Sequence, residues 1–159
     1  MIRVLVKTEK KYLLPCLQSH NPLDVVIIML GTNDLKTVFN RSANDIAEAL
    51  DGLVEDVKKW GLTVEGNEPQ IILVSPIHVN VKALRFAEFY ADIYDDNSGT
   101  KSQDLSKAIK MVAEQKRVIF VDAAKFAKPG EDGIHIDTES QEPLARAIAE
   151  ILPTLMSRP

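Results

Sequence analysis

Three short stretches of the chain are almost entirely apolar and rich in β-branched residues. Residues 25–30 form a continuous run that ends at Gly31, residues 70–75 form a second run closed by Pro76, and residues 117–122 form a third. A continuous apolar run is typical of a strand buried on both faces of a parallel sheet, because both side-chain directions avoid water. We therefore predict three strands and place the first of them in the centre of a sheet.

Apolar residues between the first two runs recur at the three- and four-residue spacing of a helix. Ser42 and Asp45 form a capping pair, and Gly61 is a stop signal, so we predict a helix between them. Its apolar positions are Ile46, Ala49, Leu50, Leu53, Val54, Val57 and Trp60.

Three weaker helical patterns complete the chain. Residues 86–94 form the first and break at the polar stretch 95–99, while the second covers residues 105–113 with Ser102 as its cap. The last helix is expected from about Ser140 to Leu152. We expect it to stop at Pro153, and we place Pro143 in its first turn, where proline is tolerated.

Strands that alternate with helices predict an α/β domain, in which a parallel sheet is covered on both faces. The 159 residues fit one domain, residues 1–159. Three strands are few for such a sheet. Residues 2–6 alternate between apolar and polar positions and could add a fourth strand.

Composition narrows the possible partners and compartments. The net charge is −4 and the basic residues are scattered, so we expect no nucleic-acid partner. The longest apolar run falls far short of the roughly 20 residues of a membrane helix, and no signal peptide is evident. We expect a soluble, cytoplasmic protein without a membrane partner. Cys16 is the only cysteine, which excludes an internal disulfide, and its apolar neighbours favour a packing role.

The first candidate for chemistry directly follows the first predicted strand, where residues 31–34 read Gly-Thr-Asn-Asp. Ligands of open α/β sheets gather at the carboxyl ends of the strands. Gly31 permits a sharp turn there, and the Asn33 amide is a neutral donor that suits an oxyanion. A plain strand-to-loop turn is the alternative, since all these residue types favour turns.

The second candidate is the Asp132–His135 pair, which lies in a loop before the last predicted helix. A carboxylate three residues before a histidine can accept a hydrogen bond from its Nδ1, which leaves Nε2 to act as base and then as acid. The alternative is a solvated loop with an incidental histidine. His20 is expected at the surface, and His78 is expected to be a loop residue near the cleft.

Together the two motifs resemble those of the SGNH (GDSL-type) hydrolases. Residues 30–34, Leu-Gly-Thr-Asn-Asp, resemble the third conserved block of that family, and residues 132–135, Asp-Gly-Ile-His, resemble the fifth. Residues 12–34 look similar to the arylesterase and acyltransferase branch. The resemblance covers residues 12–152, and the ordered pair of motifs is fairly specific.

The resemblance implies a three-layer, flavodoxin-like fold and ester hydrolysis by serine, histidine and aspartate. Asn33 would be an oxyanion donor, Asp132 would orient the imidazole, and His135 would be the base. Thr32 and Ile134 are expected in the wall of the substrate pocket. The implied partner is a small-molecule ester, and neither a metal nor an organic cofactor is implied.

The chain departs from the family pattern at the nucleophile. Family members carry it in a Gly-Asp-Ser block on the first strand, and a later glycine N–H helps to form the oxyanion hole, but this sequence contains neither block. Ser75, which ends a predicted buried strand, is expected to be a structural hydroxyl. We therefore expect the chain to represent the C-terminal part of the family domain, without its first strands.

Without the first strands, the predicted strand 25–30 has an exposed apolar edge that another segment has to cover. Residues 2–6 could fold back onto it, or the same strand of a second copy could pair with it, so a homo-oligomer is expected. Two functions follow from the sequence. The leading one is an esterase or acyltransferase acting on small acyl esters, and the alternative is a catalytically inactive remnant that serves as a binding or assembly module.

Overall fold

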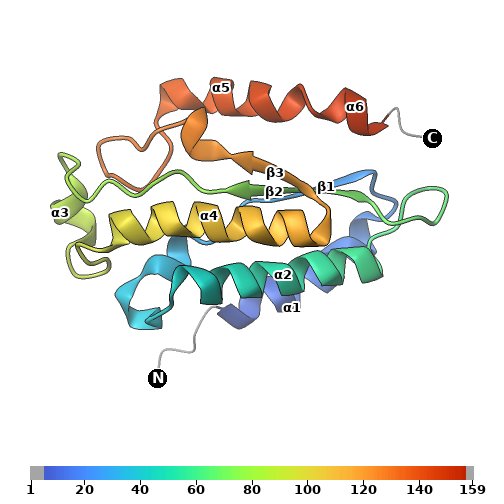
Figure 1. The fold of residues 1–159 in the computed structure, drawn as a ribbon, viewed down its shortest axis with the longest axis horizontal. Coiled ribbons are helices and arrows are strands. Elements are labelled where there is room, and N and C mark those ends of the chain that lie inside the picture. Colours follow the sequence, from blue (N-terminus) through green and yellow to red (C-terminus); the bar gives the residue numbers. More distant parts are fainter. Residues whose placement is uncertain (1–5, 157–159) are drawn as a thin grey trace.

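The computed structural model describes residues 6–156, which form a parallel sheet of three strands between two layers of helices (Figure 1). The elements in chain order are α1 (Val6–His20), β1 (Val25–Ile28), η1 (Thr32–Leu35), η2 (Thr37–Phe39), α2 (Ala43–Trp60), β2 (Gln70–Ser75), α3 (Phe86–Tyr90), α4 (Ser98–Lys116), β3 (Ile119–Asp122), η3 (Ala123–Lys125), α5 (Thr138–Ala149) and α6 (Leu152–Met156). The predicted α/β fold is confirmed.

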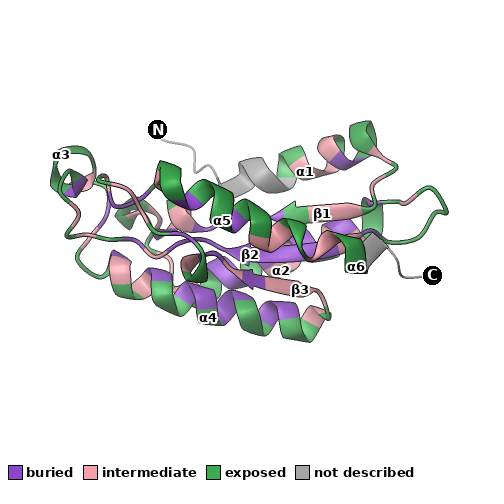
Figure 2. Cartoon of the chain, turned by 90° about the horizontal axis from the view of Figure 1, so that it is seen from above, coloured by how far each residue is buried: buried purple, intermediate pink, exposed green. Residues whose placement is uncertain are grey.

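The sheet has the order β1-β2-β3, with Val25 opposite Gln70 and Ile72 opposite Ile119. Strand β2 is the central one and is buried along almost its whole length (Figure 2). Our placement of the first strand in the centre was wrong, because β1 pairs on one side only within residues 6–156. Ile27 is 45% exposed there. An apolar run indicates that both faces of a strand are covered, but it does not indicate how many strands pair with it.

Helices α2 and α4 cover one face of the sheet, and α5 with α6 covers the other (Figure 1). The larger core lies under α2 and α4, where Val54, Val57, Leu73 and Ile109 are completely buried. Burying one such side chain stabilises the fold by about 1.5–3 kcal/mol. The smaller core lies on the opposite face, where Leu144 of α5 packs against β2. This sandwich holds the carboxyl ends of the strands in place.

Helix α2 confirms the prediction made from its capping pair. The Ser42 hydroxyl accepts a hydrogen bond from the Asp45 N–H, and the Asp45 carboxylate accepts one from the Ser42 N–H, so both caps are present. Gly61 follows the last residue of the helix. Local hydrogen bonds and one apolar face are sufficient to specify this helix.

Helix α1 was not predicted. The basic residues and Pro15, which lies inside the helix, obscured a pattern in which Leu13 and Leu17 are one turn apart and pack onto the core. The helix also packs against α2. Of the expected strand over residues 2–6, residues 2–5 lie outside the described part of the chain, and Val6 begins α1.

The remaining helix boundaries also differ from the predictions. Helix α3 ends at Tyr90 and is followed by turns, and α4 begins at Ser98, four residues before its predicted cap. Pro143 lies beyond the first turn of α5 because Asp137 caps that helix earlier than expected. Pro153 lies within α6 and does not end the helical region. The weaker patterns thus located these helices but not their ends.

The outer side of β1 borders a largely apolar hollow of about 520 Å³, lined by α1, β1 and Leu53 of α2. Met29 and Leu30, just beyond the strand, are also substantially exposed. Unpaired strand edges of this kind are sites of association. No helix in the described part of the chain is long and apolar enough to cross a membrane.

Candidate active site

The Asp132–His135 loop lies between η3 and α5 and folds around one carboxylate. Asp132 Oδ1 accepts hydrogen bonds from the backbone N–H groups of Ile134 and His135, at 2.9 and 3.0 Å. Its Oδ2 lies 2.6 Å from His135 Nδ1. The expected hydrogen bond is therefore present, and the carboxylate holds both the backbone of the loop and the imidazole ring.

The charge of this carboxylate is set by opposing effects. Burial alone would raise the pKa of Asp132, but the hydrogen bonds from the His135 ring and from the two backbone N–H groups hold that pKa below its usual value. Asp132 is thus ionised at neutral pH and accepts a hydrogen bond from the Nδ1–H of His135. The His135 side chain is 75% exposed, against 24% for Asp132, so the imidazole is anchored from one side and open to a reactant on the other.

Gly133 allows the chain to make this loop. Its φ is +78°, and a Cβ on it would collide with the carbonyl oxygen of Asn80. The same two residues form a hydrogen bond from the Asn80 N–H to the Gly133 carbonyl, at 2.9 Å. Ile134 is buried in the main core, so this predicted pocket residue packs inward and contributes its backbone N–H to Asp132.

The Gly31–Asp34 motif forms a tight turn at the carboxyl end of β1. Gly31 has a φ of +125°, and the Asp34 N–H donates to its carbonyl at 3.0 Å. The Leu35 side chain is buried and anchors the turn in the core, whereas Asn33 is exposed and Thr32 is half-buried. The amide of Asn33 is therefore accessible to a ligand, as an oxyanion donor must be.

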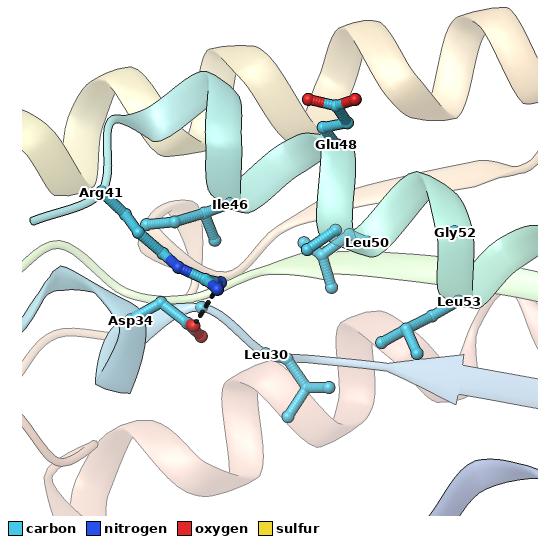
Figure 3. A pocket seen from close by; sticks show the side chains of 10 residues that line it. Leu30, Asp34, Arg41, Ile46, Glu48, Leu50, Gly52 and Leu53 are labelled. Atoms are coloured by element: carbon cyan, nitrogen blue, oxygen red, sulfur yellow. Dashed lines mark hydrogen bonds and ion pairs between the residues drawn. The ribbon is translucent and has the colours of Figure 1, made fainter. Parts of the chain in front are cut away.

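Asp34 has a different environment from Asn33. Its carboxylate lies 3.1 Å from the Arg41 guanidinium, and the pair stands at a hollow of about 250 Å³ between the turn and α2 (Figure 3). Leu30, Ile46 and Leu50 provide the apolar part of that hollow. The hollow around Asp132 and His135 is a separate one, lined by residues 128–132 and 135–139. The two motifs thus border different depressions of the surface.

Two tyrosines lie between the motifs. The Tyr94 hydroxyl donates to the Thr32 carbonyl at 3.3 Å, and the Tyr90 ring centroid lies 6.5 Å from that of His135. The rings of Tyr90 and Tyr94 are in turn 5.8 Å apart. In the sequence these residues indicate only the apolar face of a helix. Their spacing contains no signal of a contact with Thr32, 62 positions before Tyr94, or with His135.

The serines provide no nucleophile beside His135 in the part of the chain that the structure describes. Ser75 is completely buried and bonded to Ser106 and Asp122, at 3.0 and 3.2 Å, so it is the structural hydroxyl that we expected. The other described serines take part in hydrogen bonds to groups other than His135: Ser19, Ser42, Ser98, Ser102 and Ser140.

The other polar candidates lie at the end of α1 and after β2. His20 is exposed at the end of α1, with its Nδ1 2.9 Å from the Cys16 carbonyl oxygen, and Cys16 is half-buried. His78 is half-buried after β2. Within residues 6–156, no group of three or more His, Cys, Asp or Glu side chains has the geometry to hold a metal ion.

Comparison with solved structures finds close relatives of this arrangement. Est24, a carbohydrate acetylesterase from Sinorhizobium meliloti, is 34% identical with a TM-score of 0.81. The native aryl esterase of M. smegmatis is 33% identical with a TM-score of 0.81, and a putative arylesterase from Agrobacterium tumefaciens is 26% identical with a TM-score of 0.78. Each match covers 91% of this chain and 67% of the relative. This chain therefore spans about two thirds of the length of these relatives.

A comparison with curated proteins gives no match. The model of the GDSL-like lipase/acylhydrolase family matches residues 8–141, which include both candidate motifs. The family match, the sequence identities and the shared fold agree. The chain belongs to the GDSL-like lipase/acylhydrolase family, the SGNH hydrolases.

Proposed function

We propose that this chain contributes the oxyanion donor and the Asp–His pair to a serine esterase that acts on small acyl esters. The observation that carries the proposal is the 2.6 Å contact between Asp132 Oδ2 and His135 Nδ1, in a loop where the rest of the imidazole is open. The names of the relatives, aryl esterase and carbohydrate acetylesterase, support a small acyl group as the part that is transferred.

In the proposed reaction a serine Oγ attacks the ester carbonyl carbon, and its proton passes to Nε2 of His135. Asp132 holds the imidazole in the required tautomer and stabilises the imidazolium. The Asn33 amide donates a hydrogen bond to the oxyanion. His135 then returns the proton to the leaving alcohol, and water releases the acyl group by the same route. An alcohol in place of this water would make the reaction an acyl transfer. The groups named need neither a metal nor an organic cofactor.

The proposed reaction needs a nucleophilic serine other than the described ones, because each of these forms hydrogen bonds with other groups. We propose that residues 1–159 belong to one SGNH domain whose nucleophile lies in a Gly-Asp-Ser segment beyond this sequence. The length of the relatives supports this proposal, because about a third of each has no counterpart here. Thr32 lies in the same turn as Asn33, whereas the Ile134 side chain is buried under its loop. We therefore propose Thr32 as the better candidate for substrate contact.

The test is release of p-nitrophenolate from p-nitrophenyl acetate by this chain and by a longer protein that carries Gly-Asp-Ser upstream. We expect turnover only from the longer protein, and we expect its His135→Ala variant to fall to background. His20→Ala is the matched control, because His20 bonds only within α1. A longer protein that does not hydrolyse the ester would refute the esterase proposal.

A second function, a binding or assembly module without catalysis, is favoured by the engaged serines and by the edge of β1, which has no partner strand within residues 6–156. Pairing of β1 with a second copy would make such a module a homo-oligomer. This alternative predicts that His135→Ala leaves binding and assembly unchanged. Loss of oligomers after Ile27→Lys on the edge, measured by sedimentation, would support it, whereas a monomeric parent protein would exclude this mode of assembly.

A further inference from the structure

The connector between β2 and α4 touches both candidate motifs. We define it as residues 80–94. At its start, the Asn80 N–H donates to the Gly133 carbonyl and the Arg85 N–H donates to the Glu131 carbonyl, each at 2.9 Å. At its end, the Ile93 carbonyl accepts hydrogen bonds from the Thr37 N–H at 2.9 Å and from its hydroxyl at 3.1 Å. The connector thus ties the His135 loop to the segment that follows the Asn33 turn (Figure 1).

An aromatic cluster fills the space along this connector. The Phe86 ring lies 6.0 Å from Tyr90 and 6.3 Å from Tyr94, and Tyr90 and Tyr94 meet edge to face. Phe86 and Tyr94 are almost completely buried, while Tyr90 is half-buried and packs against the His135 ring. Because tightly packed rings have little freedom to shift, a fixed cluster at this point restricts the separation of the two motifs.

Tyr94 makes a polar contact between the cluster and the turn. Its hydroxyl donates to the carbonyl of Thr32, which belongs to the same peptide plane as the N–H of Asn33. The orientation of this plane sets the position of the Asn33 Cα, from which the backbone φ and the side-chain torsions of Asn33 direct the amide. The bond is long at 3.3 Å, so its contribution is modest.

The donor is available throughout the working range of a serine esterase. Burial, followed by the proximity of Tyr90 and Asp34, raises the pKa of Tyr94 to about 12. The hydroxyl therefore keeps its proton at neutral and mildly alkaline pH. A phenolate at this position could not donate to a carbonyl oxygen.

We propose that Tyr94 is a positioning residue that orients the Thr32–Asn33 peptide, and so the Asn33 amide, relative to His135. The effect of Tyr94 on catalysis rests on the proposed esterase function, but its effect on the orientation of the peptide does not. It assigns a role to a residue of the connector that lies far in sequence from both motifs. Tyr94 itself does not touch the reacting atoms.

The structural test uses this chain and the variant Tyr94→Phe, which keeps the ring and removes the hydroxyl. We expect the backbone and side-chain amide ¹⁵N resonances of Asn33 to shift, while those of residues around Lys116 stay in place and circular dichroism shows an intact fold. Tyr12→Phe is the matched control, because Tyr12 is 67% exposed on α1. Asn33 resonances that stay unchanged in Tyr94→Phe would overturn the proposal.

The catalytic test uses the longer protein with Gly-Asp-Ser, with its active fraction determined by titration with a phosphonate ester. Loss of one modest hydrogen bond predicts a kcat about two- to fivefold lower in Tyr94→Phe. We expect an unchanged KM and an unchanged pH profile, since the Asp132–His135 contact remains. An unchanged kcat would overturn the catalytic role. If the parent protein hydrolyses no ester, the proposed function fails, and the Asn33 resonances alone decide whether Tyr94 orients this peptide.

Discussion

The two candidate motifs are stabilised in different ways. Three hydrogen bonds to one carboxylate, all within four residues, orient the His135 ring in its loop, while Asn80 and Arg85 of the connector tie the loop to the rest of the fold. The Gly31–Asp34 turn has short-range bonds from the Asp34 N–H to the Gly31 carbonyl and from the Lys36 N–H to the Asn33 carbonyl, but its contacts with Leu105 and Tyr94 come from distant parts of the chain.

This difference shows how the parts of one site can differ in their dependence on the fold. A carboxylate that accepts three nearby hydrogen bonds orients its histidine wherever the loop lies. An exposed amide on a turn points in a useful direction only if the surrounding core holds the turn. We therefore expect substitutions in the Asp132–His135 loop to act on the chemistry directly, and substitutions around the Asn33 turn to act through its position.

The largest effect is expected from Asp132→Asn in the longer, serine-containing protein. The amide cannot hold the imidazole in the required tautomer or stabilise its positive charge, so kcat should fall about 10³- to 10⁴-fold. Steady-state hydrolysis of p-nitrophenyl acetate measures this change. Asp137→Asn is the control, because Asp137 caps α5 through Ser140. An equal loss of kcat in the control would show that the effect is not specific to the His135 partner.

The next effect is expected from Asn33→Ala in the same protein. Loss of one oxyanion donor should lower kcat about 10²- to 10³-fold. The free energy of unfolding should stay the same, since the Asn33 side chain is exposed. Asn67→Ala, in the exposed loop before β2, should change neither quantity. An unchanged kcat in Asn33→Ala would contradict the oxyanion role and favour the interpretation of residues 31–34 as a plain turn.

Three glycine substitutions compare the surroundings of the two motifs in this chain. Gly133→Ala places a Cβ against the Asn80 backbone oxygen, while Gly31→Ala meets the Leu105 side chain at 2.9 Å, which can move. Gly66 shares a positive φ of +80° but has open space around it. We expect urea unfolding to give losses of about 2–4 kcal/mol for Gly133→Ala, about 2 for Gly31→Ala and about 1 for Gly66→Ala. The reverse order would contradict the packing described here.

The smallest effect concerns acid stability. The folded-state pKa of Asp132 is lowered, so its carboxylate stabilises the fold above the unfolded pKa, near 3.8, and this contribution is lost as the pH falls through the folded value. Wild-type protein should therefore lose stability below about pH 4 more steeply than Asp132→Asn. Urea unfolding at several acidic pH values measures the difference. Parallel curves would show that the carboxylate is not stabilised by its neighbours.

Much of the fold could be predicted from local patterns. The capping pair at Ser42 and Asp45 specified α2, and the apolar runs located β2 and most of β3. The weaker signals failed where packing competes with them. Pro15 concealed α1, and Ser102 looked like a cap although its hydroxyl bonds to the Val79 N–H and the Gly99 carbonyl inside α4.

The sequence by itself determined the family, the order of strands and α-helices from β1 to α5, and the Asp132–His135 contact, because each depends on residues that are close along the chain. Only the tertiary structure decided that α1 is a helix packed on the core, that the described serines are engaged elsewhere, and that Tyr94 reaches the peptide of Asn33. These features join residues that are distant in sequence, and their positions follow from packing of the whole core, which no local pattern records.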